Sequence, residues 1–168
     1  MGMPLSETAG LAKEVRTMGR FYLAYGSNLN VDQMERRCPT ATLVGTATIK
    51  GYELLFKGSK TGSFLTIEKC EGEYVPVGVW LVSEQDEKRL DIYEGYPDFY
   101  YKKDMKVTLK TFEGERYKID AFVYIMHEER PLGMPSLFYV RTCLEGYNDF
   151  GFKREHIEKA IEKSRKGV

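Results

Sequence analysis

One short segment of the chain combines residue types that could bind a small anion. Tyr25-Gly26-Ser27-Asn28 follows an apolar run and precedes a helical pattern. Glycine lets a ligand approach the backbone closely, and consecutive N–H groups before a helix form a site for a carboxylate. Gly, Ser and Asn are also ordinary residues of a strand-to-helix turn, so the motif alone leaves both interpretations open.

A second candidate is Glu94, in the last turn of a predicted helix that Gly95 ends. A carboxylate there faces the negative end of the helix dipole, and with burial this raises its pKa above the usual value of about 4.3. A carboxyl group with a pKa of about 6–7 is a useful acid and base at neutral pH. Asp91, one turn earlier, is the rival candidate, and an exposed, solvated Glu94 is the simpler alternative.

A third candidate is Tyr139, one turn into a helix that Ser136 is placed to cap. A buried tyrosine needs a hydrogen-bond partner, which is either a ligand or a core group. Other chemistry has less support. The two histidines lack the spacing of metal ligands or of a nucleophile's base, so no metal site is predicted. A thiol enzyme that uses Cys38 or Cys143 is a less favoured alternative.

The elements that must position these residues are mostly strands. We predict strands over 21–25, 41–56, 63–67, 75–82, 100–111 and 116–126, and helices over 31–37, 84–94, 136–145 and 153–164. Gly45 and Gly51 are expected at bends or bulges, and Gly72 with Pro76 at a turn. Strands outnumber crossover helices, so a doubly wound parallel sheet does not fit. A mixed or antiparallel sheet curled around a pocket fits better.

Composition bounds the class of protein. The chain has 168 residues, 42% apolar and 30% charged, which predicts one globular domain over 21–168 after a tail of uncertain order over 1–20. Lys plus Arg and Asp plus Glu are 25 each, which argues against nucleic-acid binding by bulk positive charge but leaves room for a local basic patch. No apolar run approaches the roughly 20 residues of a membrane span. Three cysteines without a CxxC motif predict reduced thiols in a cytoplasmic protein.

In chain order, the distinctive segments are Tyr22–Leu29, Gly45–Ala47, Gly51–Phe56, Gly78–Trp80, Leu90–Pro97, Tyr100, and Pro135-Ser136 with Tyr139. Their order and spacing resemble the γ-glutamylcyclotransferase family. The resemblance implies an α+β fold, with a small, partly open mixed β-barrel and flanking helices. It also implies a reaction without a cofactor. The α-amine of a γ-glutamyl group attacks its own γ-carbonyl and releases 5-oxoproline and a free amine or amino acid.

The same resemblance implies roles for individual residues. Glu94 falls at the family's catalytic glutamate, where it would act as general acid and base. The substrate-binding positions fall at Tyr22, Leu23, Ala24, Tyr25, Gly26, Ser27, Asn28 and Tyr139. Backbone N–H groups of the turn would hold either the substrate α-carboxylate or the developing oxyanion, and both roles stay open. The Tyr-Gly-Ser-Asn spelling resembles the branch that includes the animal enzyme and the antibiotic-pathway cyclotransferase.

Two classes of function follow from these observations. The enzyme would take a small-molecule γ-glutamyl substrate and need no cofactor, metal, nucleic acid or membrane, and a homodimer stays open as its assembly state. The alternative is a non-catalytic module of the same fold that binds a small ligand or a protein. Glu94 divides the two, because a buried carboxylate facing an anionic ligand would cost desolvation and repel it. Glu94 therefore favours the enzyme.

Overall fold

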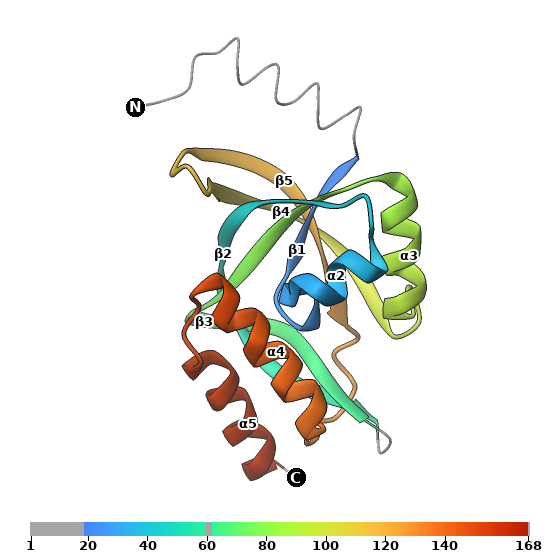
Figure 1. Ribbon diagram of the computed structural model, residues 1–168. Coiled ribbons are helices and arrows are strands. Elements are labelled where there is room, and N and C mark those ends of the chain that lie inside the picture. Colours follow the sequence, from blue (N-terminus) through green and yellow to red (C-terminus); the bar gives the residue numbers. More distant parts are fainter. Residues whose placement is uncertain (1–18, 60–61, 168) are drawn as a thin grey trace.

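The computed structural model describes residues 19–59 and 62–167 (Figure 1). Within them, strands close a barrel in the order β1-β3-β2-β4-β5. The strands are β1 (Arg20–Ala24), β2 (Thr42–Ser59), β3 (Gly62–Val82), β4 (Tyr100–Thr111) and β5 (Arg116–Met126). The helices are the 3-10 turn η1 (Ser27–Leu29), α2 (Val31–Arg37), α3 (Glu84–Glu94), α4 (Leu137–Phe150) and α5 (Glu155–Gly167).

The expected α+β fold with a small mixed barrel is confirmed, but the ring is closed where a partly open one was expected. Neighbouring strands are antiparallel except β1 and β5, which run parallel. This parallel joint has two residue pairs, Phe21 with Ala121 and Tyr22 with Phe122. The joint between β2 and β4 also has two pairs. The barrel is therefore closed through two short seams.

Apolar strand residues fill the barrel and the layer beneath the helices. The run Ala121–Met126 of β5 is buried along its whole length, as a continuous apolar strand should be. Figure 1 shows α3 on one side of the barrel and α4 with α5 towards the other. Helix α4 packs closely on η1, where Gly146 leaves no room for a side chain against Leu29. Neither this helix nor any other in the described residues is long and apolar enough to cross a membrane.

Local capping signals place the helices that carry the site. The Asn30 side chain accepts a hydrogen bond from the Gln33 N–H at the start of α2. Ser83 and Asp86 form a capping box at the start of α3, and Gly95 ends that helix in the left-handed region with φ 63°. The end of α3 at Gly95, which the sequence predicts, is confirmed, as are the bounds of β4 and β5 and the expected irregularities at Gly45 and Gly51.

Several predicted boundaries are wrong. Strand β2 ends at Ser59 and not at 56, and helix α5 spans Glu155–Gly167 and not 153–164. Gly62–Val82 is one strand, β3, and not two strands separated by a turn, because long-range pairing with β2 carries the chain through Gly72 as a bulge. Helix α4 continues past 145 to Phe150, since the stop signal is Gly151 with φ 71°. Strand β1 begins at Arg20, one residue early. Residues 1–18 of the expected tail lie outside the described part of the chain.

Candidate active site

A cavity of about 400 Å³ opens where the end of β1, the end of α3 and the start of α4 converge. Its walls are mostly aromatic, in line with a chain rich in tyrosine, whose ring is apolar and whose hydroxyl is polar. The lining residues are Tyr22, Tyr25, Gly26, Ser27, Asn28, Phe64, Leu65, Ile92, Tyr93, Glu94, Gly95, Phe99, Tyr100, Tyr124 and Tyr139. The cavity therefore brings together all three regions that the sequence singled out.

Two of the carried-over positions do not line this cavity. Leu23 and Ala24 are fully buried in the barrel core, where their backbones pair with Val79 and Gly78 of β3. Their place in the sequence, directly before the turn, makes them part of the strand that holds the turn in position. In this segment the cavity is lined by Tyr22 and by the residues from Tyr25 to Asn28.

Glu94 is the last residue of α3, and its partly buried side chain lines the cavity. Burial raises the pKa of its carboxyl to about 7, and the nearby charge of Arg37 lowers the pKa only in part. No hydrogen bond from the described residues contributes to this pKa. The carboxyl group is thus close to half-ionised at neutral pH and free to exchange a proton with a bound molecule.

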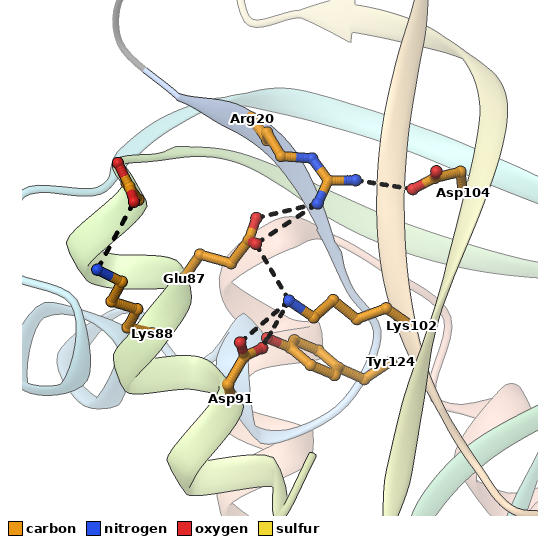
Figure 2. Close-up of polar contacts among 8 residues, drawn as sticks. Arg20, Glu87, Lys88, Asp91, Lys102, Asp104 and Tyr124 are labelled. Atoms are coloured by element: carbon orange, nitrogen blue, oxygen red, sulfur yellow. Dashed lines mark hydrogen bonds and ion pairs between the residues drawn. The ribbon is translucent and has the colours of Figure 1, made fainter. Parts of the chain in front are cut away.

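Asp91, the rival carboxylate, is engaged elsewhere. It lies 2.8 Å from Lys102 Nζ and accepts a 2.6 Å hydrogen bond from the Tyr124 hydroxyl (Figure 2). Lys102 also lies 3.1 Å from Glu87, which in turn pairs with Arg20. Asp91 does not line the cavity. Its role in the structure is to tie α3 to the barrel, which leaves Glu94 as the carboxyl group of the site.

The turn after β1 is held rigidly beside Glu94. The Tyr25 hydroxyl donates a 2.6 Å hydrogen bond to the Tyr124 carbonyl, and the Asn28 amide donates one of 2.9 Å to the Tyr22 hydroxyl. At the start of η1, the N–H groups of Ser27 and Asn28 have no backbone acceptor among the described residues. N–H groups without a backbone acceptor, in residues that line a cavity, are suited to a carboxylate or an oxyanion.

Tyr139 crosses from α4 to the same turn. Its hydroxyl accepts a 3.1 Å hydrogen bond from the Leu65 N–H and lies against Gly26, where a β-carbon would be 3.3 Å away. Its ring packs edge-on against Phe64, with 5.2 Å between centroids. Burial raises the pKa of Tyr139 well above its usual value, so the hydroxyl stays neutral. The same cause keeps Tyr22, Tyr25 and Tyr100 neutral.

Arg37 is a site residue that sequence reasoning missed. Its guanidinium donates hydrogen bonds to Ser27 Oγ, Asn28 Oδ1 and the Tyr93 hydroxyl, and it lies 3.5 Å from the centroid of the Tyr93 ring. It thereby links α2, the turn and the end of α3. In the sequence, Arg37 stands at the end of the predicted helix that follows the Gly-Ser-Asn turn. This position is only a weak indication of a site residue, because basic residues at helix ends are common. Tyr100, Phe64 and Phe99 were also missed.

The two thiols considered as nucleophiles are both buried. Burial raises the pKa of Cys38 and of Cys143 to about 12, so each thiol is protonated at neutral pH. A protonated thiol is a poor nucleophile. The structure therefore gives no support to a thiol mechanism.

Solved structures of known proteins share the fold of this chain. A solved structure described as gamma-glutamyl cyclotransferase is similar with a TM-score of 0.69 at 29% identity, covering 84% of this chain and 85% of that one. A yeast structure described as a cyclotransferase specific to glutathione shares the fold, with a TM-score of 0.62 at 14% identity over 89% and 96% of the two chains.

Residues 22–140 match the family model described as gamma-glutamyl cyclotransferase, AIG2-like, and the chain belongs to that family. The gamma-glutamylcyclotransferase of Homo sapiens is 30% identical over 150 residues, which are 84% of this chain and 78% of that protein. The Bos taurus protein of the same name is 29% identical over 145 residues, or 82% and 75% of the two. The matched region contains every residue that lines the cavity.

Proposed function

We propose that this protein is a γ-glutamyl cyclotransferase that uses Glu94 as its general acid and base. The observation that carries the proposal is a carboxyl group with a pKa of about 7, without a hydrogen bond from the described residues, in a cavity beside a Gly-Ser-Asn turn. Relatives that cover most of the chain bear the name of this activity. The substrate is a small molecule in which an amine is joined to the γ-carboxyl group of glutamate.

The reaction needs positioning and one proton carrier. The attacking α-amine and the γ-carbonyl belong to the same molecule, so the cavity has only to fold the substrate into a reactive shape. The α-ammonium group, with a usual pKa of about 8, gives a proton to the Glu94 carboxylate. The amine nitrogen then bonds to the γ-carbonyl carbon. As the original amide C–N bond breaks, Glu94 gives this proton to the leaving nitrogen. The ring nitrogen then loses its second proton to Glu94, which leaves 5-oxoproline, and that proton passes to the freed amine, which departs as an ammonium ion.

The turn after β1 is proposed to bind the charged part of the substrate. The N–H groups of Ser27 and Asn28 would hold either the α-carboxylate or the oxyanion that forms at the γ-carbonyl. Because Arg37 engages the Ser27 and Asn28 side chains, we assign substrate contact here to the backbone. The neutral Tyr139 hydroxyl, above Gly26, closes the other side of this subsite.

The test is release of 5-oxoproline from γ-glutamyl-alanine, glutathione, ε-(γ-glutamyl)-lysine and a γ-glutamyl aminoglycoside side chain. Glu94→Gln keeps the shape of the side chain but cannot carry the proton, so kcat should fall about 10²–10⁴-fold. Glu84→Gln is the matched control, because that side chain lies on the same helix and is 89% exposed.

The outcomes separate the competing hypotheses. Turnover by the wild type and by Glu84→Gln, with collapse in Glu94→Gln, supports both the reaction and the residue. Turnover that survives in Glu94→Gln contradicts the assignment, and Asp91 would be tested next. If no substrate in the panel is turned over while γ-glutamyl compounds still bind, the protein is a binding module of the same fold.

A further inference from the structure

A second hollow lies between β2 and β4 and shares no lining residue with the candidate active site. At about 770 Å³ it is larger than the first cavity. It is lined by consecutive residues of both strands, 46–50 of β2 and 105–108 of β4. Side chains alternate between the two faces of a strand, so a groove that touches consecutive residues runs along the strand edges. We call this hollow the β2–β4 groove.

The groove exists because the two strands separate below a short seam. They pair only at Gly45 with Thr111 and at Thr46 with Lys110. Beyond that seam β4 stays paired with β5 on its other side, and among the described residues no strand pairs with the β4 edge that faces the groove. The facing edge of β2 is partly covered further on, where Lys57 bridges to Leu132. The β4 edge is therefore the more open of the two.

Positive charge is concentrated around the groove. Within the described part of the chain, its lining contains no acidic residue. It contains six basic residues, which are Lys50, Lys103, Lys106, Lys110, Arg116 and Lys118. Of these six residues, only Lys106 has an ion-pair partner among the described residues, Asp120 at 4.0 Å. The chain as a whole has equal numbers of basic and acidic residues. The groove is thus a local basic patch on a protein without net charge.

The arrangement of these charges is unfavourable for the fold itself. Lys110 lies directly across from Arg116 in the antiparallel pair of β4 and β5, and Lys118 is two residues beyond Arg116. Like charges directly opposite each other on a sheet are destabilising. Residues that oppose local stability without a compensating contact are expected at functional positions.

The floor of the groove is apolar. Ala47, Ile49 and Val107 are buried, and Met105 and Tyr52 are partly buried beside them. Apolar groups at the floor and cations at the rim match an extended segment whose side chains alternate between apolar and acidic. A nucleic acid could meet the cations but has no backbone N–H groups to pair with a strand edge.

We propose that the β2–β4 groove binds an acidic segment of another polypeptide in extended conformation, which pairs with the free edge of β4. Strand addition to an exposed sheet edge is a common mode of peptide recognition, in which main-chain hydrogen bonds supply affinity and alternate side chains supply specificity. Apolar residues of the partner would lie on Ile49 and Val107, and its carboxylates would face Lys106 and Lys110. The proposal does not depend on the reaction proposed above.

Lysines on an edge strand have another known use, which is to prevent edge-to-edge aggregation. The two explanations predict different behaviour. Lysines that only protect the edge would repel a second copy of this chain and bind nothing. Lysines that select a partner would repel a basic strand, would not attract a neutral one and would attract an acidic one, so the same charges favour one partner and disfavour the others.

The experiment measures binding of a fluorescent peptide of alternating Glu and Val, about ten residues long, to the full chain by anisotropy. The variant Lys106→Glu/Lys110→Glu should bind at least about tenfold more weakly, because like charges would now face the peptide. The matched control is Lys153→Glu/Lys159→Glu, which reverses two exposed lysines that do not line the groove and should leave binding unchanged. Both variants should release 5-oxoproline as the wild type does.

Strand pairing is tested with the same peptide N-methylated at alternate residues, which cannot complete a hydrogen-bond ladder and should bind at least about tenfold more weakly. Hydrogen exchange should also slow in β4 when the unmodified peptide is bound. The proposal is overturned if the unmodified peptide does not bind, which assigns the lysines to edge protection. It is also overturned if single-stranded oligothymidylate binds more tightly, or if the peptide only competes with self-association of the chain.

Discussion

Glu94 and Asp91 lie one turn apart on α3, yet their surroundings give them different chemistry. Asp91 is bonded to Lys102 and Tyr124, outside the cavity. Glu94 faces the cavity, and burial raises the pKa of its carboxyl to about 7. The different surroundings of these two carboxyl groups thus give Asp91 a structural role and Glu94 a pKa suited to acid–base chemistry.

A raised carboxyl pKa makes the stability of the protein depend on pH in a definite direction. Between about pH 4.5, the ordinary value, and about pH 7, the unfolded chain loses the Glu94 proton while the folded protein keeps it. The folded state therefore loses stability over this window as pH rises. Glu94→Gln does not titrate, so its unfolding free energy should exceed that of the wild type by about 1–2 kcal/mol at pH 8.

Urea unfolding of both proteins at pH 4.5 and pH 8 provides the measurement. The difference between variant and wild type should be small at the lower pH and reach its full size above pH 7. A difference that is the same at both values would mean that the carboxyl is not destabilised by burial in the folded protein.

Arg37 is predicted to act through Glu94 and the turn without touching the reacting atoms. Its charge lowers the pKa of Glu94, and its hydrogen bonds hold Ser27 and Asn28. Arg37→Met should move the acidic limb of the kcat/KM profile to higher pH and lower kcat about tenfold or more. Arg37→Lys keeps the charge but loses the fork of donors, so it should lower kcat while the limb stays in place.

A purely structural role for Arg37 would give a different result. Both variants would then lose stability and activity together, without a shift of the pH profile in either. The sequence could flag Glu94, because an acidic residue in the last helical turn violates a helix rule. It could not flag Arg37, because an arginine at that place obeys the same rule and its contact with the turn depends on how α2 packs.

At the scale of elements, the sequence predicted what is set by neighbouring residues. Caps at Asn30, Ser83 and Gly95 depend on contacts within a few residues, and the bounds of α2 and α3 were predicted correctly. Strand β3 was divided in the prediction because Gly72 looks like a turn from its neighbours alone. Its continuity is set by pairing with β2, where Lys50 faces Tyr74 and Tyr52 faces Lys69.

Packing of α4 on the turn provides a prediction at this scale. A β-carbon on Gly146 would lie 2.7 Å from the Leu29 carbonyl carbon and 2.8 Å from the Asn30 nitrogen, both backbone atoms that cannot rotate away. Gly146→Ala gains up to about 1 kcal/mol in helix propensity, but forcing α4 away from η1 costs about 1–3 kcal/mol. We expect a net loss of stability and, since α4 also carries Tyr139, a rise in KM.

The control for this prediction is Leu137→Ala on the same helix, where the side chain is 86% exposed. It should change the unfolding free energy by less than about 0.5 kcal/mol. If Gly146→Ala is as stable as the wild type, α4 is free to shift and does not fix the turn.

At the scale of the whole molecule, the barrel and α3 are joined by one network of charges. Arg20 of β1 bridges Glu87 and Asp104, and Lys102 of β4 bridges Glu87 and Asp91 (Figure 2). The network spans strands that are far apart in the chain, so the sequence could not predict it. The order of strands in the closed barrel could not be predicted from the sequence either, because the parallel pairing of β1 with β5 is a long-range contact.

Lys102 is the central cation of this network, and the last prediction concerns its removal. Burial alone would lower the pKa of Lys102, but hydrogen bonds to Asp91 and Glu87 outweigh it and raise the pKa. Its side chain is only 15% exposed, so Lys102→Met would leave two partly buried carboxylates without their shared partner. Breaking such a pair from one side costs about 2–4 kcal/mol, measured by urea unfolding at pH 7.

Lys88→Met is the matched control, because Lys88 lies on α3 (Figure 2). It pairs with Glu84, and both side chains are exposed. An exposed pair of this kind contributes little, so its loss should cost less than about 0.5 kcal/mol. Since α3 ends at Glu94, Lys102→Met should also lower the rate of 5-oxoproline release by more than its loss of folded protein explains. Equal stability of the two variants would show that apolar packing alone, and not the network, fixes α3 and its carboxyl group against the barrel.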